Sequence, residues 1–287
     1  MSAQTSSNQL SDVDLQELVA ASDTGGRNPL GWVGKFLTVI AISWSVYQLW
    51  IASPLPYIFA DIIPIPNNSQ TRPTHLSFAI FLAFMAYPAL KSSPKNRIPI
   101  QDWVFALVGT ACVAYLAVFS DQLADRPGLP TTADLVASAV GLVFLLEATR
   151  RALGPPLMVV AIIFAAYIFF GEYAPEMISW KGASFNKGMS HLWITQEGVF
   201  GIALGVSTSF VFLFVLFGAL LDKAGAGNYF IKVAFASLGH LRGGPAKAAV
   251  LASAMTGLIS GSSIANVVTT GTFTIPLMKR VGFSAEK

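Results

Sequence analysis

The feature that most limits the fold is a series of six long stretches that contain no Asp, Glu, Lys or Arg. They span residues 36–60, 73–90, 103–120, 135–146, 154–171 and 198–221. The hydrocarbon core of a bilayer requires about 20 apolar residues of helix, and inside lipid each helix must satisfy its own backbone groups. The pattern therefore predicts an all-α integral membrane protein, a polytopic helical bundle with about six transmembrane helices.

The composition agrees with lipid as the solvent. Hydrophobic residues make up 54% of the chain and charged residues only 11%, too few to cover a water-soluble globule of this size. The Lys and Arg residues are scattered and form no basic face, which argues against a nucleic-acid partner. Cys112 is the single cysteine and cannot form an internal disulfide. His191 has no neighbours at metal-ligand spacing, so we expect no metal site there.

Local signals refine the helix ends. Pro54 is expected to end the first helix near Ser53, and Pro155 suits the first turn of the fifth. The fourth stretch is the shortest, so its helix must continue past Glu147, whose charge then snorkels or faces protein. Gly201 and Gly205 in the sixth stretch form a small-xxx-small pair, for which we expect a packing role.

The basic residues orient the bundle. The loops after the second and fourth stretches carry five of them, and those after the first and third carry two: Lys91, Lys95, Arg97, Arg150 and Arg151 against Arg72 and Arg126. Because cytoplasmic loops are enriched in Lys and Arg, the amino terminus is predicted to be cytoplasmic and residues 172–197 external. Residues 177–196 mix aromatic and basic side chains, as expected of a segment at the membrane interface. Residues 228–240 are predicted to form a short interfacial helix with Lys232 in water.

The last long apolar stretch is different. Residues 248–278 are uncharged, with Arg242 and Lys247 before them and Lys279 and Arg280 after them. The run is too long for one span and too short for two, which need about 40 residues. Basic residues at both ends favour one side of the membrane for both. We therefore predict a re-entrant helical hairpin, with arms at 248–259 and 264–278 and a turn at 260–263.

The turn and second arm of this hairpin are too polar to face lipid. Their small and polar residues form the candidate site: Ser260, Gly261, Ser262, Ser263, Asn266, Thr269 and Thr270. Broken helices at mid-membrane offer oxygens to a hard cation and helix amino termini to an anion. We therefore predict that this segment binds a cation and a substrate. The alternative is close helix packing through small residues.

Three segments also resemble a known family. They are GLISGSSIANVVTTGTFTIPLMKRVGF (257–283), TQEGVFGIALGVSTSFVFLFVLFGALLDKAGAG (195–227) and the linking RGGPAKAAV. Together they resemble the fused permease of tripartite ATP-independent periplasmic (TRAP) transporters, in the branch served by TAXI-type binding proteins. The likeness covers residues 150–287, whereas residues 30–150 match only in layout.

The resemblance implies an elevator-type secondary transporter of the bacterial inner membrane, driven by a cation gradient. Sodium is the expected cation, through Ser260, Ser262 and Asn266, and no other cofactor is expected. The broader family often has an acidic residue where Asn266 stands. The implied partners are a TAXI-type periplasmic binding protein, a small organic anion, the lipid bilayer and the remaining half of the large permease subunit.

The resemblance also suggests a division of the chain. We expect a disordered cytoplasmic tail (1–30), a four-helix small-subunit-like module (31–152), the start of the large subunit with scaffold and interfacial helices (153–243), and the first hairpin of the transport domain (244–287). The family's large subunit continues into a second hairpin, so this chain is expected to be truncated and not competent for transport alone.

Two other functions compete with transport. One is a non-transporting membrane assembly subunit. The other is an intramembrane serine protease, since Gly261-Ser262-Ser263 could form a nucleophile turn. Such an enzyme needs a histidine base at the same depth, and His75 is expected near the outer end of its helix. We therefore favour a transporter over an enzyme.

Overall fold

The computed structural model describes residues 26–283, except positions 28, 30, 91, 95, 96, 261–265, 267–269, 272, 273, 276, 277 and 280. Within this part of the chain every regular element is a helix, as the sequence predicted. The chain divides into two units. We call Gly26–Phe212 the bundle unit and the described residues from Leu213 onward the hairpin unit. This division falls inside the predicted 153–243 segment, and the domain boundaries expected from the sequence stay predictions.

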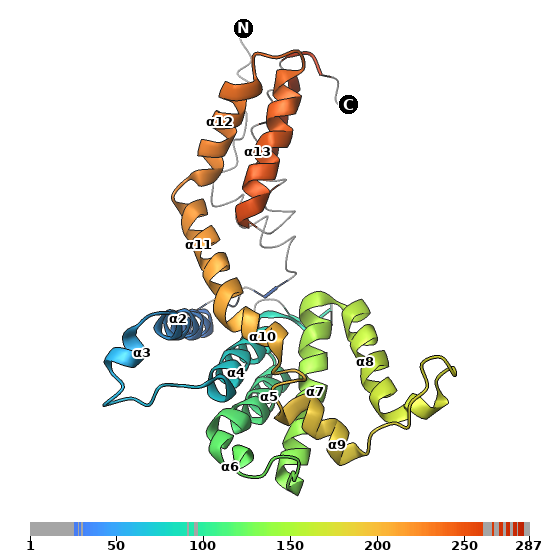
Figure 1. The fold of residues 1–287 in the computed structure, drawn as a ribbon. Helices are drawn as coiled ribbons and strands as arrows, with labels where there is room; N and C mark the ends of the chain where they lie inside the picture. Colours follow the sequence, from blue (N-terminus) through green and yellow to red (C-terminus); the bar gives the residue numbers. More distant parts are fainter. Residues whose placement is uncertain are drawn as a thin grey trace. The chain divides into compact units, whose positions relative to one another are not determined.

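The bundle unit is built on five long helices: α2 (Trp32–Ala52), α4 (Asn68–Ala86), α5 (Ile100–Val118), α7 (Thr132–Leu153) and α8 (Pro155–Phe170). Helices α4, α5 and α7 pack against one another, with α2 on α4 and α8 on α7 (Figure 1). The shorter elements are α3 (Leu55–Ile58), α6 (Ser120–Ala124), the 3-10 turn η1 (Gly171–Tyr173), α9 (Phe185–Met189), the π-helix η2 (Ser190–Ile194), α10 (Ile202–Val206) and the π-helix η3 (Ser207–Val211).

Among the described residues, five helical segments are long and apolar enough to cross a membrane: Trp32–Ala52, Ile100–Val118, Thr132–Leu153, Pro155–Tyr173 and Ile202–Leu221. They correspond to five of the six predicted spans. The exception is the predicted span 73–90. Its residues up to Ala86 lie in α4, which begins earlier, at Asn68, and whose first two turns carry Asn68, Gln70 and Arg72. This polar start lowers the hydropathy of α4 below that of the other five.

The helix ends follow the local signals. Helix α2 ends at Ala52, just before Pro54, and Pro155 occupies the first turn of α8. Helix α7 continues past Glu147 to Leu153 and ends at Gly154, whose φ of 87° suits glycine. Both α4 and α7 start with a capping box, Asn67–Gln70 in the first and Thr131–Asp134 in the second.

A tryptophan packs the segment between α8 and α10 into the core of the bundle unit. Trp193 of η2 is 1% exposed and packs edge-to-face against Phe200 at 5.3 Å between ring centroids. A Cβ on Gly141 of α7 would lie 2.2 Å from the Trp193 ring, so only glycine leaves room for it. Met189 is buried as well. This end of residues 177–196 is thus packed against protein, because α7 provides a groove for the Trp193 ring, and the membrane-interface position expected for the segment stays a prediction.

Large apolar side chains cover the outside of the bundle unit. Val39, Ile42 and Val46 on α2 are 57–59% exposed, and α8 has no buried residue at all. Contiguous apolar surface of this extent is rare on proteins that are soluble in water. The chain is accordingly a multi-pass membrane protein whose exposed helix faces are suited to lipid.

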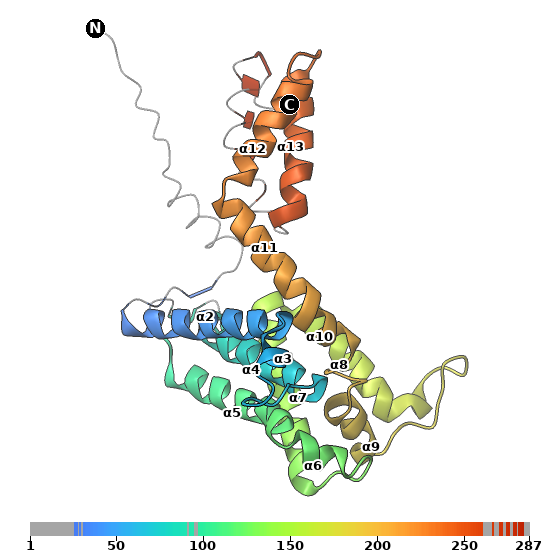
Figure 2. The same cartoon turned by 60° about the vertical axis from the view of Figure 1, so that its left-hand side comes forward.

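The hairpin unit contains α11 (Phe212–Lys223), α12 (Ala226–Leu238) and α13 (Gly244–Ser260). Gly225, with a φ of 84°, makes the predicted turn between α11 and α12. Helices α12 and α13 lie side by side (Figure 2) and bury Ile231, Ala234, Ala248 and Ala252 between them. Lys232 is exposed, as the sequence predicted for this helix.

Candidate functional site

The arms of the predicted hairpin meet through one asparagine. Asn266 Nδ2 donates hydrogen bonds to the Ser253 carbonyl oxygen at 2.9 Å and to Ser253 Oγ at 3.0 Å. Ser253 lies in α13, and the described residues of the second arm are helical at 266, 270, 271, 274, 275, 278 and 279. A carbonyl oxygen can only accept, so the amide nitrogen of Asn266 must face Ser253. The contact brings the two arms together, as the hairpin prediction requires.

Two buried oxygen atoms in this hairpin have no hydrogen-bond partner in the described structure. They are Thr256 Oγ1 and Asn266 Oδ1. Ser253, Thr256 and Gly257 share one face of α13, because residues three and four apart lie above one another. Asn266 lies over this face, since a Cβ on Gly257 would be 3.2 Å from Asn266 Nδ2. A buried oxygen without a donor costs about 1–3 kcal/mol, so these atoms are suited to a ligand that needs oxygens.

Two other hydroxyl groups among the described residues of the second arm are already engaged. Thr270 Oγ1 donates to the Asn266 carbonyl oxygen at 2.6 Å, and Thr274 Oγ1 to the Thr270 carbonyl oxygen at 2.8 Å. Both side chains are buried, at 5% and 4% exposure. Each of these two hydroxyl groups is therefore held by a hydrogen bond within the second arm, unlike Thr256 Oγ1.

The predicted site residues are described to different extents. Asn266 and Thr270 lie on the second arm, and Ser260 is the last residue of α13, with its side chain outside the description. Gly261, Ser262, Ser263 and Thr269 lie outside the described residues. The sequence analysis did not predict Ser253, Thr256 and Thr274, which lie before or after the predicted site residues at 260–270. Their hydroxyls recur at helical spacing, and that pattern was the signal that could have identified them.

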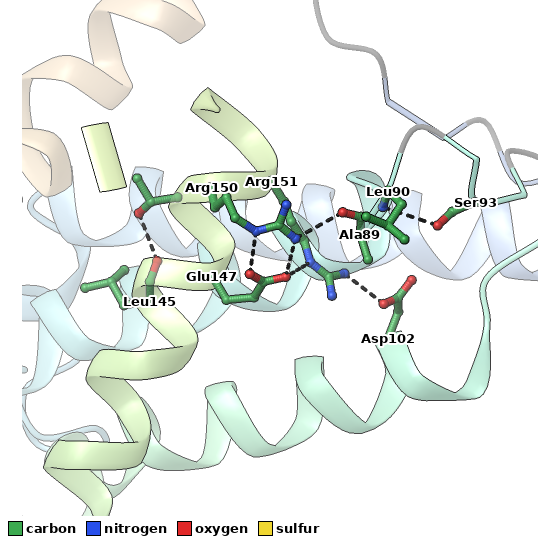
Figure 3. A network of polar contacts seen from close by, with 9 residues as sticks. Ala89, Leu90, Ser93, Asp102, Leu145, Glu147, Arg150 and Arg151 are labelled. Atoms are coloured by element: carbon green, nitrogen blue, oxygen red, sulfur yellow. Dashed lines mark hydrogen bonds and ion pairs between the residues drawn. The ribbon is translucent and has the colours of Figure 1, made fainter. Parts of the chain in front are cut away.

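The bundle unit holds an arginine–carboxylate network, which Figure 3 shows in part. It comprises Arg27, Asp102, Glu147, Arg150 and Arg151. Asp102 receives Arg27 Nη2 at 2.5 Å and Arg151 Nη1 at 2.8 Å. Glu147 receives Arg150 Nε and Arg151 Nε, both at 2.7 Å. Glu147 thus faces protein, one of the two outcomes expected from the sequence.

This network fastens segments that are far apart in the chain. The Arg27 backbone N–H donates to the Ala86 carbonyl oxygen at 2.7 Å, and Arg150 Nη2 donates to that of Ala89 at 3.0 Å. The Arg151 guanidinium lies 4.9 Å from the Phe84 ring centroid. Arg27 was expected in the tail, but its side chain is fully buried against the Asp102 carboxylate. Neither Arg27 nor Asp102 was predicted as a partner from the sequence.

A second polar cluster surrounds His75. Its Nδ1 accepts from Trp44 Nε1 at 3.1 Å and contacts the Gln48 side chain, and its Nε2 lies 3.3 Å from Ser207 Oγ. Trp44 can only donate, so Nδ1 carries the lone pair and neutral His75 donates from Nε2 to Ser207. His75 lies about two turns after the start of α4. It serves as a donor to Ser207 and not as the base that a serine nucleophile requires.

Gly205 makes room for another arginine. A Cβ there would lie 2.8 Å from Arg72 Nη2, and Arg72 Nη1 donates to the Phe200 carbonyl oxygen at 2.8 Å. The packing role expected for Gly205 is therefore present, although its neighbour is a guanidinium group. Gly201 differs, because a Cβ there would meet the backbone of Glu197 and Gly198.

Comparisons with known proteins add an independent observation. The family model described as "Tripartite ATP-independent periplasmic transporter, DctM component" matches residues 140–287, just over half of the chain. The chain is 32% identical over 130 residues to the C4-dicarboxylate TRAP transporter large permease protein DctM of Rhodobacter capsulatus, covering 42% of this chain and 30% of that protein. It is 43% identical over 70 residues to the protein of the same name from Pseudomonas aeruginosa, covering 24% of this chain and 16% of that protein.

A third relative is the uncharacterized protein YgiK of Salmonella typhimurium, 26% identical over 136 residues, which cover 42% of this chain and 31% of that protein. The chain thus spans less than a third of the length of each of these relatives. No solved structure matches the chain.

Proposed function

Because the chain belongs to the DctM component family of TRAP transporters, we propose that it is a permease component that carries an organic anion across the bacterial inner membrane. Transport is driven by a cation gradient, with sodium as the coupling ion. The family is one of transporter permeases, which implies a role other than catalysis. The relatives' names make a C4-dicarboxylate the first substrate to test.

The observation that carries this proposal is the pair of unpartnered oxygens in the hairpin, Thr256 Oγ1 and Asn266 Oδ1. Hard cations prefer oxygen ligands. Sodium carries a single positive charge, so neutral hydroxyl, amide and carbonyl oxygens can hold it without a carboxylate. The hydrogen bonds to Ser253 fix the amide nitrogen of Asn266, and its Oδ1 remains without a partner. In our proposal these atoms join Ser260 and Ser262 around sodium. Gly261, Ser263, Thr269 and Thr270 line the adjoining substrate site.

The partners follow from the same family. We propose that a soluble periplasmic protein of the TAXI type delivers the substrate, and that a small membrane subunit, supplied here by residues 31–152, supports the transport domain. The remaining half of the large subunit completes the binding site.

The cation site can be tested on the chain itself. Thr256→Val removes one hydroxyl at nearly constant volume, and Thr274→Val is the matched control, since the Thr274 hydroxyl already donates to Thr270. We expect sodium chloride, compared with choline chloride, to raise the unfolding temperature of the parent protein and of Thr274→Val. The rise should be lost in Thr256→Val. Equal responses in both variants would contradict the site.

Transport is tested by uptake of radiolabelled succinate into cells that make this chain together with a complementary large-subunit segment and a TAXI-type binding protein. Uptake should require an inward sodium gradient and fall at least about tenfold in Thr256→Val, as expected when one charge-assisted ligand is lost. Copurification of the chains without any uptake would instead favour the assembly subunit.

A further inference from the structure

The bundle unit contains a cavity of about 220 Å³ that is separate from the hairpin. It lies where α4 and α7 begin, beside α6 and the end of η2. Its apolar wall includes Leu116 and Phe200, and its polar lining includes Ser69, Arg126 and Asp134. All of these residues belong to the bundle unit, so the cavity does not depend on the placement of the hairpin unit.

The two charged side chains that line this cavity, Asp134 and Arg126, differ in how fully their hydrogen-bonding atoms are paired. Asp134, 1% exposed, accepts from the Tyr115 hydroxyl at 2.7 Å, the Thr131 N–H at 2.7 Å and Arg126 Nη2 at 3.1 Å. Arg126 makes this ion pair, but its Nε is buried and has no hydrogen-bond partner among the described residues. The carboxylate is therefore saturated by its neighbours, whereas the guanidinium group retains an unused donor.

Helix α4 adds positive potential at the same place. Asn68 and Ser69, which line the cavity, belong to its first turn. That turn has no acidic residue, whereas the first turn of α7 contains Asp134. The amino terminus of a long helix acts as about half a positive charge, and an acidic residue nearby would normally offset it. The Asn67 side chain caps the Gln70 N–H, but no acidic residue offsets the positive end of α4, which lies at the cavity together with Arg126.

We propose that this cavity binds a small oxyanion, a carboxylate or a phosphate, between Arg126 and the first turn of α4. A cation is disfavoured, because the acceptors of Asp134 are occupied and Arg126 and α4 both repel it. The apolar wall lowers the local dielectric and strengthens the attraction. In the orientation predicted from the basic loops, the cavity lies at the outer face, where an anion arrives before transport.

The test is a binding measurement on the purified chain. Radiolabelled succinate is equilibrated with the protein by dialysis, with unlabelled succinate, inorganic phosphate or chloride as competitors at equal sodium concentration and ionic strength. We expect saturable binding that succinate or phosphate displaces and chloride does not. Arg126→Gln should weaken binding at least about tenfold, as for loss of one charge-assisted hydrogen bond. Arg97→Gln, which changes an exposed arginine elsewhere, is the matched control.

Arg126→Gln could fail to fold, because it removes the cation beside Asp134. Ala124→Trp therefore provides a second variant, since Ala124 is exposed and lines the cavity without touching the ion pair. Filling the cavity should abolish binding while the protein stays folded. Absence of saturable binding, or unchanged affinity in Ala124→Trp, would overturn the proposal.

A lipid phosphate could supply the same chemistry. Repeating the measurement in phosphatidylglycerol nanodiscs and in phosphatidylcholine nanodiscs distinguishes the two sources. If a phosphatidylglycerol headgroup occupies the cavity, the affinity for succinate is lower in phosphatidylglycerol. If the cavity binds only free anions, the affinity for succinate is the same in both lipids. The Thr256→Val variant, which changes the hairpin site, should bind succinate in the cavity beside Arg126 with the affinity of the parent protein. Failure of the hairpin site and failure of this cavity can thus be told apart.

Discussion

Neutralising Asp102 is the sharpest test of how the bundle unit is held together. Its carboxylate is 3% exposed and is the ion-pair partner of Arg27 and Arg151, whose side chains are fully buried. Asp102→Asn keeps the size of the side chain but leaves Arg27 without a carboxylate and Arg151 with only Glu147. Removing one partner of a buried pair typically costs about 3–5 kcal/mol, because a desolvated charge is left behind.

For a unit of this size, a loss of that magnitude lowers the unfolding temperature by about 6–20 °C. The assay is thermal unfolding in detergent, followed by tryptophan fluorescence. Asp125→Asn is the matched control, because this exposed aspartate should change stability by less than about 0.5 kcal/mol. If Asp102→Asn unfolds at the same temperature as Asp125→Asn, the network contributes nothing and the reasoning is refuted.

A double-mutant cycle isolates the pair from other effects. Once Arg27→Gln has removed one cation, Asp102→Asn should cost less than it does alone, with a coupling of about 0.5–3 kcal/mol. Additive costs would show that the two residues do not interact in the folded protein.

Two further predictions concern single contacts. Gly141→Ala places a Cβ 2.2 Å from the Trp193 ring and should destabilise the bundle unit by about 1–3 kcal/mol, measured by thermal unfolding; an unchanged midpoint would mean that Trp193 does not pack there. Asn266→Asp replaces the donor that faces the Ser253 carbonyl with a second acceptor and should raise hydrogen exchange of the hairpin backbone, whereas protection equal to that of the parent protein would argue against the contact between the arms.

Much of the helical layout could be predicted because it depends on local properties. The length of the charge-free stretches predicted five spans, and Pro54 and Pro155 marked helix ends, since the constraints on proline act within a few residues. The span at 73–90 was placed too late along the chain because the capping box at Asn67 starts α4 before the apolar residues begin.

Contacts between distant segments were not predictable in the same way. Arg27 pairs with Asp102, although α2 and α4 lie between these residues in the sequence. Nothing in the polar tail indicates that Arg27 becomes buried. Likewise, nothing in residues 177–196 indicates that Trp193 packs into a groove whose space depends on a glycine in α7. In the hairpin, length and flanking charge predicted two arms, but the pairing of Ser253 with Asn266 needed coordinates.

The central claim is that both ends of residues 248–278 lie on one side of the membrane, with the polar bend inside it. It is tested by replacing Lys247 or Lys279, one at a time, with cysteine in a Cys112→Ser background and labelling intact cells with a membrane-impermeant maleimide before and after permeabilisation. The account predicts that both sites react only after permeabilisation. Labelling of the two sites from opposite faces would contradict it.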